Sequence, residues 1–202
     1  MTRTEALISL LLVVAAAAPF IWFWIERRRR VECLQQLATE YGGKCYRDPS
    51  FLMNSICQLR HNGRDYYVSY RPEQGTDGAD LLLFACKVIT PFKFSISNGD
   101  RAPWWQRITR STVEEWPRVQ VPEMDPQLIF FTPEEELLRK WLNHQSVRQA
   151  IDQLMNEMSE IRALGNGLQV RKAFLHDNTD PAKIKGWISQ IDHVAENLRA
   201  DH

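Results

Sequence analysis

The feature that constrains this chain most is a run of twenty residues near its start, from Ala6 to Ile25, that contains no charged side chain. At about 1.5 Å per residue, a helix of that length measures roughly 30 Å, the thickness of the hydrocarbon core of a bilayer. Aromatic residues crowd its C-terminal end and Arg27–Arg30 follow at once, an order that membrane–water interfaces favour. The sequence therefore predicts a transmembrane helix whose anchor residues include Ala6, Leu10, Val14, Pro19, Trp22, Trp24 and Ile25.

The charges that flank this run predict its direction. Arg3 is the one basic residue on the N-terminal side, whereas a cluster stands on the other side, and basic flanks stay in the cytoplasm. Each arginine of the cluster would also be attracted to anionic headgroups by about 1 kcal/mol. We therefore expect a single-pass protein of a bacterial inner membrane, with its N-terminus outside, its folded domain in the cytoplasm and the lipid bilayer as a partner. The residues expected to set the topology and meet the headgroups are Arg27, Arg28, Arg29 and Arg30.

A cleaved signal peptide is the alternative explanation of the same run. Arg3, a short apolar stretch and the small residues Ala16, Ala17 and Ala18 fit that pattern. Against it, Pro19 would stand directly after the cut, the apolar run continues beyond it, and the arginines would resist translocation. An uncleaved anchor is the favoured reading, and an exported domain stays open as an alternative.

The remainder of the chain is expected to form one folded domain. Residues 1–30 are assigned to the anchor and its basic flank, and residues 31–202 are long enough to bury a core of their own. The whole chain holds 25 basic and 25 acidic residues, and because the first thirty residues carry an excess of basic ones, the domain is mildly acidic. That charge argues against nucleic acid as a partner.

Turn and alternation patterns predict a sheet after a first helix over residues 31–42. An Asn62-Gly63 turn between two alternating segments is a strong hairpin signal. Residues 98–126 form a long connection that could hold a short helix around Trp105–Thr112. The expected strands in this half of the domain are Lys44–Arg47, Ser55–Arg60, Arg64–Arg71, Leu81–Ile89 and residues 92–97.

The last third of the chain carries clear start and stop signals. A strand at Leu128–Phe131 leads into a helix with Thr132 as N-cap, Pro133 in its first turn and acidic residues at the positive end of the helix dipole. A second helix, a hairpin that turns at Gly165-Asn166-Gly167, and a final helix opened by Asp180-Pro181 follow. The strands are joined by tight turns and not by βαβ crossovers. The predicted fold is therefore α+β: an N-terminal transmembrane helix followed by a largely antiparallel sheet packed with about four helices on one face.

The run from Pro126 to Met158, which includes PQLIFFTPEEELLRKWLNHQSVRQAIDQLM, resembles a segment that recurs in uncharacterised bacterial proteins of similar length. In those proteins a strand, a capped helix, a second helix, a GNGLQV-like hairpin and a final helix follow one another, and many begin with a membrane helix. The resemblance covers residues 126–198 and the general layout. It implies a fold and a membrane setting, and it carries no activity or functional residue across.

Motifs that would indicate catalysis or metal binding are missing from the sequence. There is no GxSxG, Walker or GxGxxG pattern, and no HxxxH or HExxH spacing. The cysteines Cys33, Cys45, Cys57 and Cys86 lack any CxxC spacing, and we expect them to be small core residues, although an exported domain could pair them. The sequence therefore predicts no catalytic residue, no cofactor and no metal.

The most suggestive segment for function is the loop over residues 101–116, where two adjacent tryptophans stand among arginines. That composition suits a membrane interface or a protein-binding surface. The first hypothesis is therefore a membrane-tethered, non-enzymatic interaction or scaffold module with a protein partner at this loop. The alternative is a small-ligand or lipid-binding domain that uses a cleft between sheet and helices. The candidate interface residues are Trp104, Trp105, Arg107 and Arg110.

Overall fold

The structure is a computed structural model that describes residues 3–47, 55–72, 80–99, 116–173 and 179–198, with the side chains of the first helix described from Val14 onward. Within these residues the chain folds around one nine-stranded sheet in the order β1-β2-β3-β4-β9-β8-β5-β7-β6. Every paired neighbour is antiparallel. The predicted α+β class and antiparallel sheet are confirmed. The strands are β1 Lys44–Arg47, β2 Ser55–His61, β3 Arg64–Pro72, β4 Asp80–Cys86, β5 Lys93–Asn98, β6 Arg118–Val119, β7 Leu128–Phe131, β8 Glu160–Leu164 and β9 Leu168–Ala173.

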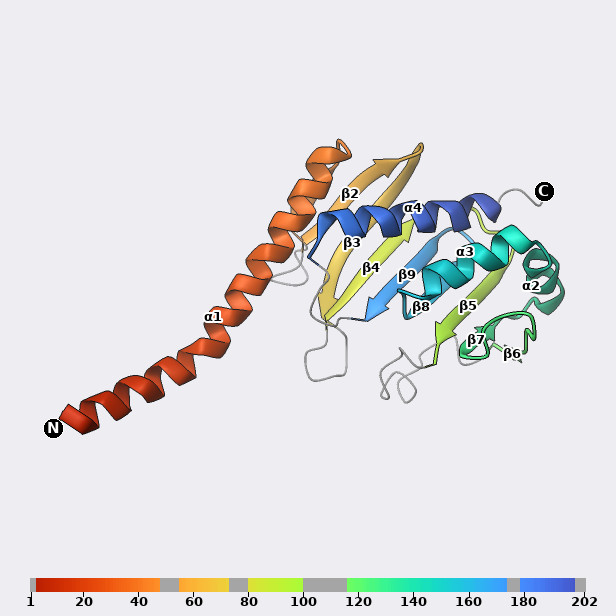
Figure 1. Ribbon diagram of the computed structural model, residues 1–202. Helices are drawn as coiled ribbons and strands as arrows, with labels where there is room; N and C mark the ends of the chain where they lie inside the picture. Colours follow the sequence, from red (N-terminus) through yellow and green to blue (C-terminus); the bar gives the residue numbers. More distant parts are fainter. Residues whose placement is uncertain (1–2, 48–54, 73–79, 100–115, 174–178, 199–202) are drawn as a thin grey trace.

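Helices cover one face of this sheet (Figure 1). They bury their apolar stripes against the inward side chains of the strands: Trp187 meets the ring of Phe84, and Trp141 meets that of Phe94. The apolar stripe of α4 is buried from Ile184 to the C-cap Leu198. The helices of the described part are α1 Arg3–Glu40, α2 Glu135–Leu142, α3 Gln145–Met155 and α4 Pro181–Asn197.

The first helix is longer than the sequence predicts, because the apolar run, the arginines and the expected helix over residues 31–42 form one element of 38 residues. Its C-terminal part packs on the sheet through Leu34 and Leu37, which are fully buried. Its N-terminal part projects away from the sheet, and the ribbon bends along its length (Figure 1). Pro19 lies inside the helix, and a proline there is a usual cause of such a bend.

The predicted membrane anchor is wrong. Among the helices of the described residues, none combines the length and the apolar character that crossing a membrane requires. Glu26 and the arginines continue the same helix to Glu40. The expected transmembrane and single-pass character, and the cell-membrane location with an outside N-terminus and a cytoplasmic domain, are corrected with it.

The β2–β3 hairpin forms where the Asn-Gly signal predicts it. Asn62 and Gly63 both have positive φ angles, 48° and 76°, which is the backbone of the tight turn that matches the twist of two antiparallel strands. The turn brings His61 opposite Arg64 and fixes the register of the whole pair. Side chains of the first residues of β3 are thereby held at the end of the sheet that α4 crosses.

The start of α2 differs from the prediction. Its N-cap is Glu134 and not Thr132, and the Glu134 side chain makes no capping hydrogen bond. The Thr132 hydroxyl instead accepts a hydrogen bond from the Glu134 backbone N–H at 2.9 Å and donates one to the Lys93 carbonyl at 2.6 Å. The threonine therefore joins the helix start to β5 through one hydroxyl that donates and accepts at once, and the N-cap position falls two residues later, at Glu134.

The start of α4 agrees with the prediction and supports a test. The Asp180 carboxylate accepts a hydrogen bond from the Ala182 backbone N–H at 2.9 Å. Asp180→Ala is expected to lower the free energy of unfolding by about 1 kcal/mol, since the first turn loses a hydrogen-bond acceptor. Urea unfolding followed by circular dichroism measures the change. Lys183→Ala, at an exposed position of the same turn, should change stability by less than about 0.5 kcal/mol; equal losses in the two variants would argue against capping.

Candidate functional site

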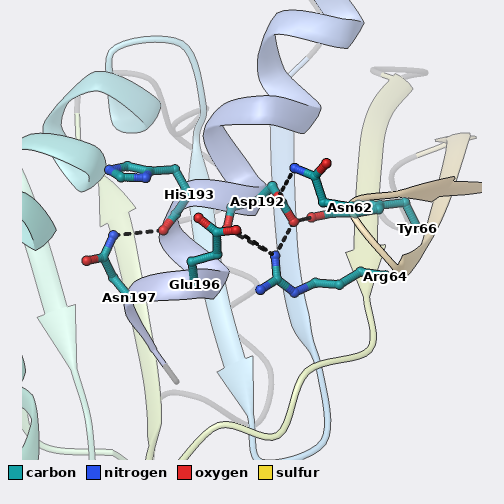
Figure 2. A network of polar contacts seen from close by, with 7 residues as sticks. All are labelled: Asn62, Arg64, Tyr66, Asp192, His193, Glu196 and Asn197. Carbon is teal, nitrogen blue, oxygen red and sulfur yellow. Dashed lines mark hydrogen bonds and ion pairs between the residues drawn. The ribbon is translucent and has the colours of Figure 1, made fainter. Parts of the chain in front are cut away.

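A buried carboxylate, Asp192 of α4, is the centre of a polar cluster under the helix layer (Figure 2). The residue is 2% exposed. Asn62 Nδ2 donates to its Oδ2 at 2.7 Å, and the Tyr66 hydroxyl donates to its Oδ1 at 2.6 Å. Arg64 Nη1 forms an ion pair with the same Oδ1. We call these four residues the Asp192 cluster.

Local structure explains why these side chains meet. Arg64 and Tyr66 alternate along β3 on the face that also carries Val68, so they point into the helix layer. Asp192 stands four residues after Ile188 on the buried stripe of α4. The hairpin turn adds Asn62 from the neighbouring position. Two segments 126 to 130 residues apart in the chain are thereby joined by side-chain hydrogen bonds.

The cluster fixes the protonation state of its members. Burial disfavours the charged form of Asp192, but hydrogen bonds from Tyr66, Asn62 and Arg64 outweigh burial and hold the pKa of the carboxyl below its usual range. Burial raises the pKa of Tyr66, and its hydrogen bond to Asp192 raises that pKa further. At neutral pH the cluster therefore contains a carboxylate, a guanidinium and a neutral phenol.

This arrangement suits a fixed contact and not a proton-transfer step. Both oxygens of Asp192 are occupied by donors, and its main cationic partner, Arg64, is itself only 8% exposed. Glu196 reaches Arg64 at 3.9 Å from the solvent side. No group of three or more His, Cys, Asp or Glu residues in the described segments is arranged to hold a metal. The cluster fastens α4 to the β2–β3 hairpin.

A second candidate site is the exposed end of α1. Phe20 is 77% exposed and Trp22 is 62% exposed, and Trp24 is similar at 60%. We call Phe20–Ile25 the aromatic segment. Of the anchor residues that the sequence predicts, Val14, Pro19, Trp22, Trp24 and Ile25 are exposed on α1. Ala6 and Leu10 lie in the same helix, but their side chains fall outside the described part.

The arginine cluster lies where α1 passes from the aromatic segment to its packed part. Arg28 Nε donates to Glu32 at 2.8 Å, and its guanidinium stands over the Trp24 ring at 5.8 Å. Arg30 points to the domain, where it lies 5.7 Å from the centre of the Tyr70 ring. Arg28 and Arg29 are exposed, whereas Arg27 and Arg30 are half-buried. The four side chains predicted to meet headgroups therefore fall into an outward pair and a pair that is partly covered.

The cysteines differ from the expectation of unpaired core residues. Register places Cys45 of β1 directly opposite Cys57 of β2, and the two form a disulfide with a Cα–Cα distance of 4.1 Å. Cys33 and Cys86 are buried and are not joined in a disulfide, as predicted for small core residues. Disulfides persist mainly in oxidising compartments. The pairing depends on the register of two strands, which the spacing of twelve residues alone does not fix.

The predicted interface at the loop over residues 101–116 stays a prediction. Trp104, Trp105, Arg107 and Arg110 lie outside the described residues. Sequence patterns did not predict the Asp192 cluster, although two of them pointed to it. Position 192 lies one helical turn after Ile188, on the apolar side of the final helix, and strand alternation turns Arg64 inward. A charge of each sign at inward positions is the pattern that could have revealed the pair.

Comparison with known proteins gives one informative result. No protein family matches the chain, and no curated protein matches it, so the resemblance noted for residues 126–198 stays an expectation. Among solved structures, the chain is similar to the mycobacterial trehalose monomycolate transport factor A, TtfA, with a TM-score of 0.53 and 8% sequence identity. The match covers 86% of this chain and 94% of that one. At this identity the likeness establishes a shared fold.

Proposed function

We propose that this chain is a lipid-binding protein that takes up single amphiphilic molecules with a long acyl chain. The observation that carries the proposal is the fold shared with a trehalose monomycolate transport factor over 94% of that solved chain. Trehalose monomycolate is itself a polar sugar esterified with a long acyl chain. The shared class of ligand is therefore an acyl chain with a polar, hydrogen-bonding head.

The surface of α1 supports the same class of ligand. Large apolar side chains are left in water along the aromatic segment, and burying one such side chain is worth about 1.5–3 kcal/mol. Exposed arginines follow directly, so apolar and polar contacts are available side by side. The interaction-module hypothesis depends on a loop outside the described residues and gains nothing from the comparisons. The lipid-binding alternative is therefore the better supported of the two.

Native mass spectrometry of the full chain tests the proposal. The protein is incubated with a palmitoyl ester of trehalose below its critical micelle concentration, and with free trehalose in a parallel sample. We expect a saturable complex with one or a few molecules of the ester and none with the free sugar, because the acyl chain supplies most of the binding free energy.

Lysophosphatidylglycerol and palmitate serve as further probes of head-group preference. A complex with the sugar ester that persists against excess palmitate indicates recognition of the sugar head. If none of the acyl compounds forms a complex, at concentrations where a known lipid carrier does so, the proposed function is wrong.

A further inference from the structure

The exposed surface of the aromatic segment surrounds α1 instead of forming a stripe along it. Phe20, Ile21, Trp22, Phe23 and Trp24 are consecutive, and each is more than half exposed. Because a helix turns once in 3.6 residues, five consecutive side chains point in all directions around its axis. A protein groove or a second helix covers one side of such a rod. Acyl chains of a lipid leaflet cover every side.

Charge at the end of the segment indicates which lipid surface fits. Arg28 and Arg29 are exposed one turn beyond Trp24. Arg28 is paired with Glu32, but both side chains are more than half exposed, and surface pairs of this kind contribute about 0–1 kcal/mol. The guanidinium can therefore exchange the carboxylate for a lipid phosphate, which binds arginine through two parallel hydrogen bonds. Cations at one end of an apolar rod complement an anionic headgroup layer.

The aromatic segment and the outward arginines together indicate where α1 meets a lipid surface. We propose that α1 docks the protein on an anionic bilayer by burying the aromatic segment among the lipids of the nearer leaflet. Trp22 and Trp24 lie at headgroup depth, and Arg28 and Arg29 bind phosphates. Docking on a bilayer is a different event from the proposed uptake of single lipid molecules, although both involve the aromatic segment, and it would bring the protein to a source of them.

Vesicle flotation of the full chain tests the docking. The protein is mixed with vesicles of phosphatidylcholine and phosphatidylglycerol, or of phosphatidylcholine alone, and centrifuged in a density gradient, where aggregates sink and bound protein rises. We expect the protein to rise mainly with the anionic vesicles. Arg28→Gln/Arg29→Gln should lower the partition coefficient about thirtyfold. Trp22→Ser/Trp24→Ser should lower it about a hundredfold or more.

Two matched substitutions control for general loss of aromatic or basic surface. Tyr46→Ser removes a side chain that is 52% exposed on β1, and Arg139→Gln removes a paired arginine of α2. Both should float like the parent. The proposal is overturned if the parent stays at the bottom, if it rises equally with neutral vesicles, or if the tryptophan variant rises like the parent. If the parent does not float with vesicles but still binds the sugar ester, the docking proposal is wrong and the proposed function stands. If the parent floats but binds no acyl compound, the proposed function is wrong and the docking stands.

Discussion

Asp192→Ala is expected to lower the free energy of unfolding by about 3–5 kcal/mol. The substitution removes the carboxylate that pairs with Arg64 and leaves that guanidinium buried without its anion. It also removes the acceptor of the Tyr66 hydroxyl and of the Asn62 amide. Urea unfolding monitored by circular dichroism at neutral pH gives the loss directly.

Glu196→Ala is the matched control, because Glu196 lies on the same helix and faces the same arginine. It is 55% exposed and 3.9 Å from Arg64 Nη1, so its removal should cost no more than about 1 kcal/mol. Asp192→Asn keeps the shape and one acceptor but loses the charge, and it should fall between the two. Equal losses for Asp192→Ala and Glu196→Ala would mean that the buried ion pair does not hold α4 in place.

The same carboxylate predicts how stability depends on acid. Its folded pKa lies below the value of about 3.9 for an unfolded aspartate, so Asp192 contributes stability that is fully present well above that pH and is lost as pH falls through the folded pKa. The stability difference between the parent and Asp192→Ala should therefore shrink below about pH 4. A constant difference from pH 7 to pH 3 would contradict the depressed pKa.

Reduction of the Cys45–Cys57 disulfide is expected to lower the free energy of unfolding by about 3 kcal/mol. The bond closes a loop with a sequence separation of 12 residues, and a loop of that size restricts the unfolded chain by about that amount. The native contacts of β1 with β2 remain, so the folded protein should survive mild reduction and unfold at lower urea. Urea titrations with and without dithiothreitol measure the shift.

Cysteine variants assign that shift to one bond. Cys45→Ser/Cys57→Ser should match the reduced parent and should not respond to dithiothreitol. Cys86→Ala removes a buried cysteine outside the disulfide and should retain the full response. Intact mass before and after alkylation reports the number of free thiols and the first residue of the mature chain, which also tests the exported alternative. A parent with four alkylated cysteines under non-reducing conditions would exclude the disulfide.

Much of the sheet could be predicted because its signals are local. The Asn62-Gly63 turn and the Gly165 turn each fix a hairpin within about fifteen residues, and alternation along the strands fixes which side chains face inward. Strand order could not be predicted. The pairing of β4 with β9 joins Phe84 to Val170, and no local pattern encodes a contact across that distance.

The errors have a common physical cause, since each depends on what a segment packs against. Hydropathy of residues 6–25 alone predicted an anchor, but the helix continues through the arginines to Leu34 and Leu37, which pack on the sheet. Thr132 was predicted as the N-cap of α2, but its hydroxyl donates to the Lys93 carbonyl of β5 as well, and the N-cap is Glu134, two residues later. The Asp192 cluster needs two distant segments to be placed together. Sequence periodicity gives the inward direction of a side chain but not its partner.

The position of β9 and β8 in the sheet has a consequence for how the chain assembles. These strands are made after all the others, yet they lie between β4 and β5 in the middle of the sheet. Until they are inserted, the β1–β4 ribbon and the β5–β7 ribbon each present an open edge that can pair with another chain. During synthesis, the two parts of the sheet therefore stay separate until the β8–β9 hairpin is made. That hairpin then pairs with β4 on one side and with β5 on the other, and it removes these two exposed edges as sites of aggregation.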